Sequence, residues 1–143
     1  MVRLSALPRR IRSRIAQVTR QLGRALQHDV QNNKLTGQVV KVRSNVLASS
    51  INRQFEENGG NFIATVGTDV PYAKILEFGV SRPWLIEART AKTLRFAVGG
   101  RTLFRKRVLH PPVRERSFLR ASSRDLATTI RAEYAHAAEE AIH

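Results

Sequence analysis

The stretch NFIATVGTDVPYAKILEFG, residues 61–79, predicts a strand that turns directly into a short helix. Apolar side chains alternate along residues 62–66, which is typical of a strand, here with both faces partly buried. Thr68 or Asp69 can cap the helix, and Pro71 suits its first turn, where a backbone N–H has no partner. Gly79 ends the helix because glycine adopts positive φ without strain. Apolar residues follow at helical spacing: Tyr72, Ile75, Leu76 and Phe78.

A hairpin is predicted immediately before this helix. Residues 51–57 read as a strand, with Ile51, Arg53 and Phe55 on one face, and residues 58–60 (Asn-Gly-Gly) are a strong turn signal. The strand at residues 61–66 therefore returns antiparallel, and we expect this hairpin to be the centre of the sheet. Upstream, residues 38–42 read as another strand. Ser44 can cap a short helix at residues 45–50 that turns Val46 and Leu47 inward.

Two long helices are predicted, one towards each end of the chain. The first begins at Leu7-Pro8 with Ser5 as its cap and ends at residues 31–33, and its apolar residues step by three and four. The second runs from about Ser117 to Ala141. We expect Tyr72 and Phe78 to be buried against these two helices.

The net charge is +14, and it is unevenly distributed. Residues 1–43 hold ten basic residues and one acidic residue, and residues 82–120 hold eleven and two. Such a field favours acidic partners, namely nucleic acid, an anionic membrane surface or an acidic protein face. The first helix has three interpretations: a docked surface helix, a contact with nucleic acid or acidic protein, and a membrane or targeting segment. Its basic-surface candidates are Arg9, Arg10, Arg12, Arg14, Arg20 and Arg24.

A second hairpin is predicted around Gly99-Gly100, which joins the apolar runs at residues 94–98 and 101–108. This register places Phe96 opposite Leu103 and Arg95 opposite Phe104, so both faces carry apolar and basic residues. One interpretation is an arm, about residues 84–110, that projects and meets another chain. The alternative is a solvated hairpin. The interface candidates here are Phe96, Val98, Leu103, Phe104, Arg105 and Arg107.

No catalytic constellation, metal site or cofactor site is apparent in the sequence. The four histidines, at positions 28, 110, 136 and 143, lack the i, i+4 spacing of helical metal ligands. Glu77 stands out because it lies in a mostly apolar helix. It is either a structural carboxylate paired with an arginine or one half of an inter-subunit salt bridge. Cysteine is absent, which excludes disulfides. No apolar run approaches the length of a membrane span.

Three blocks of the chain resemble the head–tail joining and tail-completion proteins of long-tailed bacteriophages. The central block is VGTD at 66–69, YA at 72–73 and LEFG at 76–79. Upstream, TGQVVKVR at 36–43 with Leu47 and SSI at 49–51 is similar to a second family block. Downstream, HP at 110–111 and RSFL at 116–119 with Ala121 is similar to a third. Asn45, Val46, Pro112 and Ser117 depart from the residues usual in the family.

The resemblance implies an α+β fold, a small antiparallel β-sheet with two long helices packed on one face, in one domain over residues 1–143. It implies a structural virion protein of the neck or tail, assembled in the host cytoplasm, with no enzymatic activity and no cofactor. The implied partners are further copies of the chain in a ring of roughly six or twelve, other neck and tail proteins with acidic faces, and nearby packaged DNA, but no membrane. The alternative is a nucleic-acid-binding module that uses the basic surface.

Overall fold

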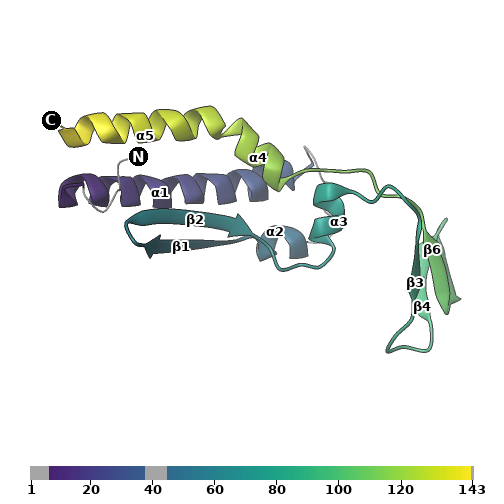
Figure 1. Ribbon diagram of the computed structural model, residues 1–143. Helices are drawn as coiled ribbons and strands as arrows, with labels where there is room; N and C mark the ends of the chain where they lie inside the picture. The colour runs from purple at the N-terminus through teal and green to yellow at the C-terminus, as the bar shows by residue number, and fades with distance from the viewer. Residues whose placement is uncertain (1–6, 38–44, 143) are drawn as a thin grey trace.

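The computed structural model describes residues 7–37 and 45–142. These residues form an α+β fold of helices and three separate two-stranded antiparallel sheets. Figure 1 shows their arrangement. The elements are α1 (Arg9–Asp29), the π-helical turn η2 (Val30–Lys34), α2 (Val46–Ser50), β1 (Asn52–Asn58), β2 (Asn61–Gly67), α3 (Ala73–Phe78), β3 (Trp84–Glu87), β4 (Leu94–Val98), β5 (Arg101–Arg105), β6 (Arg107–His110), α4 (Leu119–Asp125) and α5 (Ala127–Ile142). The strand predicted at residues 38–42 and the predicted caps Ser5 and Ser44 lie outside the described residues.

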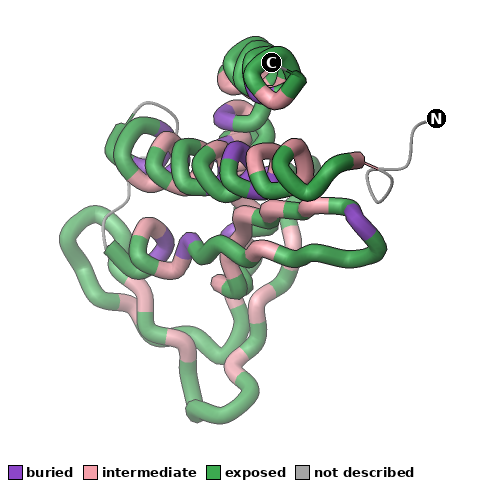
Figure 2. The backbone as a smooth tube through the Cα atoms, turned by 90° about the vertical axis from the view of Figure 1, so that its left-hand side faces the viewer, coloured by how far each residue is buried: buried purple, intermediate pink, exposed green. Residues whose placement is uncertain are grey.

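The body of the molecule is layered, with the β1–β2 hairpin, α1 and α5 stacked in that order (Figures 1 and 2). β1 and β2 pair from Asn52 opposite Gly67 to Asn58 opposite Asn61, which confirms the predicted hairpin. Among the described strands the hairpin has no further neighbour, and because the strand predicted at residues 38–42 is not described, the hairpin as the centre of the sheet stays a prediction. Only one face of β2 packs inward, because α1 covers one side and solvent the other. The two long helices therefore do not both pack on one face of the sheet. α1 packs on the hairpin, and α5 packs on α1.

The second long helix is broken at Leu126, between α4 and α5, where φ is −86° and ψ is −3°. α4 is held on the π-helical turn by an ion pair of 2.5 Å between Lys34 Nζ and Asp125 Oδ2, and Ser122 donates a hydrogen bond to Asp29. α5 is instead tied to α1, and one tie is a hydrogen bond of 2.7 Å between the Thr19 and Tyr134 hydroxyls. The two segments satisfy different partners, so the helix bends between them.

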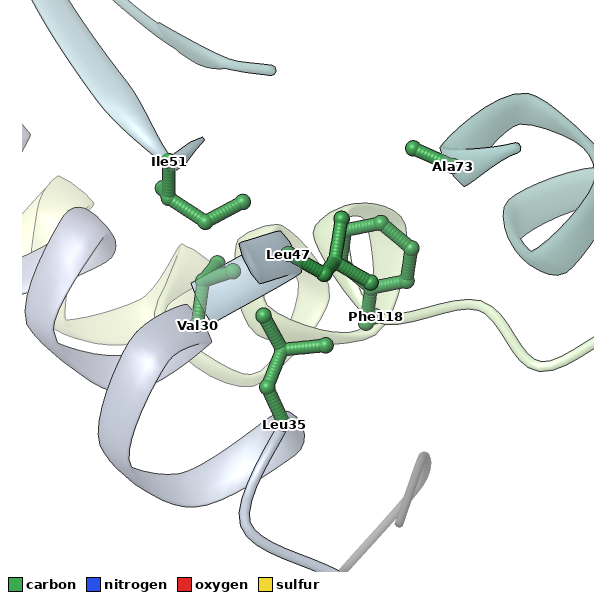
Figure 3. Packing of buried hydrophobic residues seen from close by; sticks show 6 residues of the cluster. All are labelled: Val30, Leu35, Leu47, Ile51, Ala73 and Phe118. Atoms are coloured by element: carbon green, nitrogen blue, oxygen red, sulfur yellow. The ribbon is translucent and has the colours of Figure 1, made fainter. Parts of the chain in front are cut away.

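The core lies where η2, α2, α3 and the start of α4 converge, and Figure 3 shows its six buried side chains. They are Val30, Leu35, Leu47, Ile51, Ala73 and Phe118. Leu47 faces inward as predicted, but Val46 is exposed, because a helix of a single turn presents only one side to the core. The prediction that Tyr72 and Phe78 are buried is also wrong. Their exposed fractions are 42% and 57%, because α3 turns Ala73 and Glu77 inward.

The four strands β3–β6 extend away from α1 and α5 at one end of the molecule (Figure 1). β4 and β5 pair around Gly99-Gly100 with Phe96 opposite Leu103 and Arg95 opposite Phe104, so the predicted register is confirmed. β6 pairs with β3, which the sequence did not predict. The predicted strand at 101–108 is accordingly divided into β5 and β6. We refer to residues 84–110 as the arm.

Candidate interaction surfaces

Glu77 is a buried carboxylate that binds the start of α4. Its exposed fraction is 3%, although it lies on a short helix at the edge of the body. Oε2 accepts hydrogen bonds from the backbone N–H groups of Phe118 and Leu119 at 2.8 and 2.9 Å. Oε1 accepts from the Ser117 hydroxyl at 2.9 Å and from the backbone N–H and Nε of Arg120, each at 3.0 Å. The carboxylate thus caps the N-terminus of α4, a helix from another part of the chain. Its negative charge also interacts favourably with the partial positive charge at that end of the helix.

The electrostatics of Glu77 follow from these donors. Burial alone would raise the pKa of this carboxyl, but the hydrogen bonds from the backbone of Leu119, Arg120 and Phe118 and from Ser117 outweigh it, so the pKa lies below its usual value. Arg120 also donates to the Glu77 carbonyl oxygen at 2.8 Å and lies over the Phe78 ring, 4.6 Å from its centroid. Within the chain Glu77 is paired with Arg120, as the interpretation of a structural carboxylate requires, and its place among the interface candidates stays a prediction.

The segments that lead into and out of the arm meet beside this carboxylate. Val80 and Val113 exchange backbone hydrogen bonds of 2.8 and 2.9 Å, and Arg116 N–H donates to the Leu76 carbonyl at 2.8 Å. Gly79 sits between them with φ of +68°, and a Cβ there would lie 2.6 Å from the Glu115 nitrogen. Glycine is therefore required both by its conformation and by the close approach of the returning chain.

The arm presents large apolar side chains to solvent beside its cations. Val98 and Phe104 are 57% and 53% exposed, whereas Phe96 and Leu103 are half-buried on the opposite face from Phe104. Arg105 and Arg107 are both exposed. The nearest anion to Arg107 is Glu87, at 3.9 Å. The interface candidates of the arm therefore lie close together in the fold, but they divide between its two faces.

Sequence reasoning missed a second exposed apolar pair on the arm. Leu85 on β3 and Leu109 on β6 are direct partners in the register, and both are exposed. The alternation of Trp84–Glu87 was the available signal, because Trp84 and Ile86 are half-buried while Leu85 and Glu87 face solvent. On the other face, Trp84 and His110 stack with ring centroids 4.2 Å apart. The His110 Nδ1 lies 2.8 Å from the Pro111 carbonyl oxygen.

The arginines of α1 do not form one free basic face. Arg12 Nη2 binds Glu57 at 2.9 Å, Arg14 Nε binds Glu140 at 2.9 Å, and the Arg20 guanidinium lies 4.1 Å from the centroid of the Phe55 ring. Three of the six candidates therefore hold α1 to β1 and α5. The other three, Arg9, Arg10 and Arg24, are exposed. The structure thus supports the interpretation of α1 as a docked helix.

Among the described residues no group of three or more potential ligands could hold a metal ion. Within the same residues, every helix is too short or too polar to cross a membrane.

One comparison with known proteins identifies the family. A protein-family model described as "Bacteriophage HK97-gp10, putative tail-component" matches residues 1–79. This span is more than half of the chain and ends at Gly79, a few residues before the arm. Searches of curated proteins and of solved structures found no match. The match agrees with the three sequence blocks, two of which fall wholly within it. The chain therefore belongs to the HK97-gp10-like family of bacteriophage tail components.

Proposed function

We propose that the protein is a ring-forming subunit at the neck of the phage, where it joins head to tail or completes the tail. It acts through protein–protein contacts and carries out no chemical turnover. Family membership supports a structural role in the tail. The observation that carries the finer proposal is the surface of the arm, where exposed apolar side chains lie among exposed cations.

The composition of the arm fits an interface better than a free surface. Residues 84–110 hold seven basic residues and one acidic residue, a net charge of +6. Val98, Phe104, Leu85 and Leu109 are all large apolar residues exposed on the same small segment. Protein interfaces combine an apolar centre with a polar, charged rim. The arm therefore suits a partner with an apolar depression and an acidic edge, in a further copy or in another neck or tail protein.

The ring itself is expected to contain roughly six or twelve copies. Assembly takes place in the host cytoplasm, and the finished subunit resides in the virion.

The test is a pair of substitutions at the exposed positions, Val98→Asp with Phe104→Asp. Because both side chains are already in water in the subunit, the fold should survive, and circular dichroism checks this. We expect the variant to stay monomeric in native mass measurements and to fail in complementation for infectious particles. Ile142→Asp, an equally apolar exposed position at the end of α5, is the matched control and should assemble normally. Normal assembly of the arm variant would refute the arm as the contact.

A second candidate function is nucleic-acid binding by the exposed arginines of α1. The net charge of +14 favours it, as do the exposed Arg9, Arg10 and Arg24. The low aromatic content of 6% disfavours single-strand recognition by stacking. Binding to plain duplex DNA over a salt series discriminates the two proposals. Backbone binding would lose affinity log-linearly, with a slope of about −0.9 per phosphate contact.

A further inference from the structure

We infer that the arm of one copy docks into an apolar groove between β2 and α5 of the next copy. This inference rests on the proposed ring and names the surface that receives the arm. It makes the contact head-to-tail, between two different surfaces of the same chain.

The groove exists because α5 follows α1 instead of covering the hairpin. Leu22 and Leu26 of α1 line its floor, Phe62 and Ala64 of β2 one wall, and Ile130 and Tyr134 of α5 the other. Ile63 lies at the outer edge of this wall, on the solvent-facing side of the strand. Its volume is about 290 Å³. Ile63 is 48% exposed, which is costly for so large an apolar group unless something covers it. The groove is thus an apolar depression of the kind that a large side chain from a partner can fill.

Gly23 allows the close packing of α1 and β2 that shapes this groove. It lies on α1 where the helix passes over the hairpin, and a Cβ there would lie 3.0 Å from the Ala64 Cβ. The close approach holds the hairpin against α1. On the other side, the hydrogen bond between Thr19 and Tyr134 ties α5 to the same helix. Both walls are therefore fixed to one floor, and the groove is preformed.

Charge favours the arm as the occupant. The groove lies between β2 and α5, and β1 is the strand that pairs with β2. Together these three elements hold five acidic residues and two basic ones, a net charge of −3. Two of these acids bind arginines of α1, and the exposed Glu56, Glu133 and Glu139 remain. Glu56 stands directly opposite Ile63 in the hairpin register. An apolar groove formed by elements with a net negative charge matches an arm that carries Phe104 among cations and a net charge of +6.

The geometry favours a second copy over the same chain. The arm leaves the body beyond α3, at the end away from the β1–β2 turn and the C-terminus (Figure 1). The groove lies along the body, so the arm extends away from the groove of its own chain. Because arm and groove are different surfaces, each copy offers one of each. Repetition of such a contact closes a ring when the rotation between copies allows closure.

A mixing experiment tests the head-to-tail contact. The arm variant is Val98→Asp with Phe104→Asp. The groove variant is Ile63→Lys, which replaces an apolar residue at the edge of the groove by a cation that repels the cationic arm. We expect each variant alone to be monomeric by native mass, with association weakened at least about tenfold. An equimolar mixture should form a heterodimer and nothing larger, because one working arm and one working groove remain. Thr65→Lys, exposed on the same face of β2 but outside the groove lining, is the control and should assemble like the unmodified chain.

The outcomes separate this inference from the proposed function. If the groove variant assembles like the unmodified chain, the arm docks elsewhere and only the inference is overturned. If the unmodified chain is monomeric at all concentrations, the ring itself is refuted. Two symmetric products, one from each variant alone, would also overturn a head-to-tail contact.

The absence of cysteine allows a second, independent test. A chain with Ile63→Cys and Phe104→Cys should give a ladder of disulfide-linked oligomers under mild oxidation, which reductant reverses. The control pair Phe78→Cys and Phe104→Cys has an equally exposed partner outside the groove and should give no ladder. A ladder of equal strength in both chains would mean nonspecific collision and would overturn the inference.

Discussion

Replacing Glu77 with glutamine removes the negative charge at the start of α4 while keeping the shape of the side chain. The glutamine oxygen can retain the three donors now bound to Oε1, but its NH₂ group then points at the N–H groups of Phe118 and Leu119. Two buried or partly buried N–H groups lose their acceptor. At about 1–3 kcal/mol for each unsatisfied buried donor, the loss is about 2–6 kcal/mol. The lost ion pair adds little, because the Arg120 side chain is 45% exposed.

We expect the free energy of unfolding of Glu77→Gln to fall by about 3–5 kcal/mol in urea titrations followed by circular dichroism. For a chain of this size the melting temperature should drop by roughly 10–15 °C. Glu133→Gln, an exposed carboxylate on α5, is the matched control and should change stability by less than about 0.5 kcal/mol. A Glu77→Gln protein within about 1 kcal/mol of the unmodified chain would refute the capping role derived from the hydrogen bonds.

The pH dependence of this difference has a definite sign. The pKa of Glu77 is lowered in the folded chain below its ordinary value of 4.5. Its contribution is therefore fully present above pH 4.5 and is lost as the pH falls through the lower folded value. The difference in the free energy of unfolding between the unmodified chain and Glu77→Gln should accordingly become smaller as the pH falls below 4.5. Asp29, whose pKa is lowered also, is present in both proteins and cancels from the difference.

Two further predictions use matched pairs. Gly79→Ala should cost about 2–4 kcal/mol in urea titrations, because it adds steric overlap to a positive φ, whereas Gly99→Ala, with positive φ but open space, should cost about 1–2 kcal/mol; equal costs would show that the contact is unimportant. Phe118→Ala should cost about 3–5 kcal/mol in the core, and Phe78→Ala, which is mostly exposed, should cost less than about 1 kcal/mol; the reverse order would mean that the core is misplaced.

The parts of the fold that the sequence predicted depend on local signals. The Asn58-Gly59-Gly60 turn and the Gly99-Gly100 turn specify their hairpins because both pairs of glycines take positive φ. Gly79 ends α3 for the same reason. In each case the decisive residue and its consequence lie within a few positions of one another, so a single sequence suffices.

The parts that the sequence did not predict depend on partners far along the chain. Helical periodicity places a charged residue outward, yet Glu77 faces inward because its donors come from residues 117–120. The pairing of β3 with β6 spans the whole inner hairpin. The bend at Leu126 lacks a glycine or proline, and the ion pair between Lys34 and Asp125 holds α4 at its own angle. The apolar groove between β2 and α5 could not be predicted either, since it depends on how α5 packs on α1.

The bridge between Val80 and Val113 brings the arm back to the point where it left the body. A segment whose two ends are already joined by backbone hydrogen bonds can be shortened, lengthened or exchanged without altering the path of the chain from α3 to α4. The family match stops at Gly79, the first residue before that segment. For a phage lineage this separates two kinds of inherited change. Substitutions in the body affect whether the subunit folds. On the contact proposed above, exchange of sequence within the arm would alter which surface the arm binds, so the choice of partner could evolve while the fold stays constant.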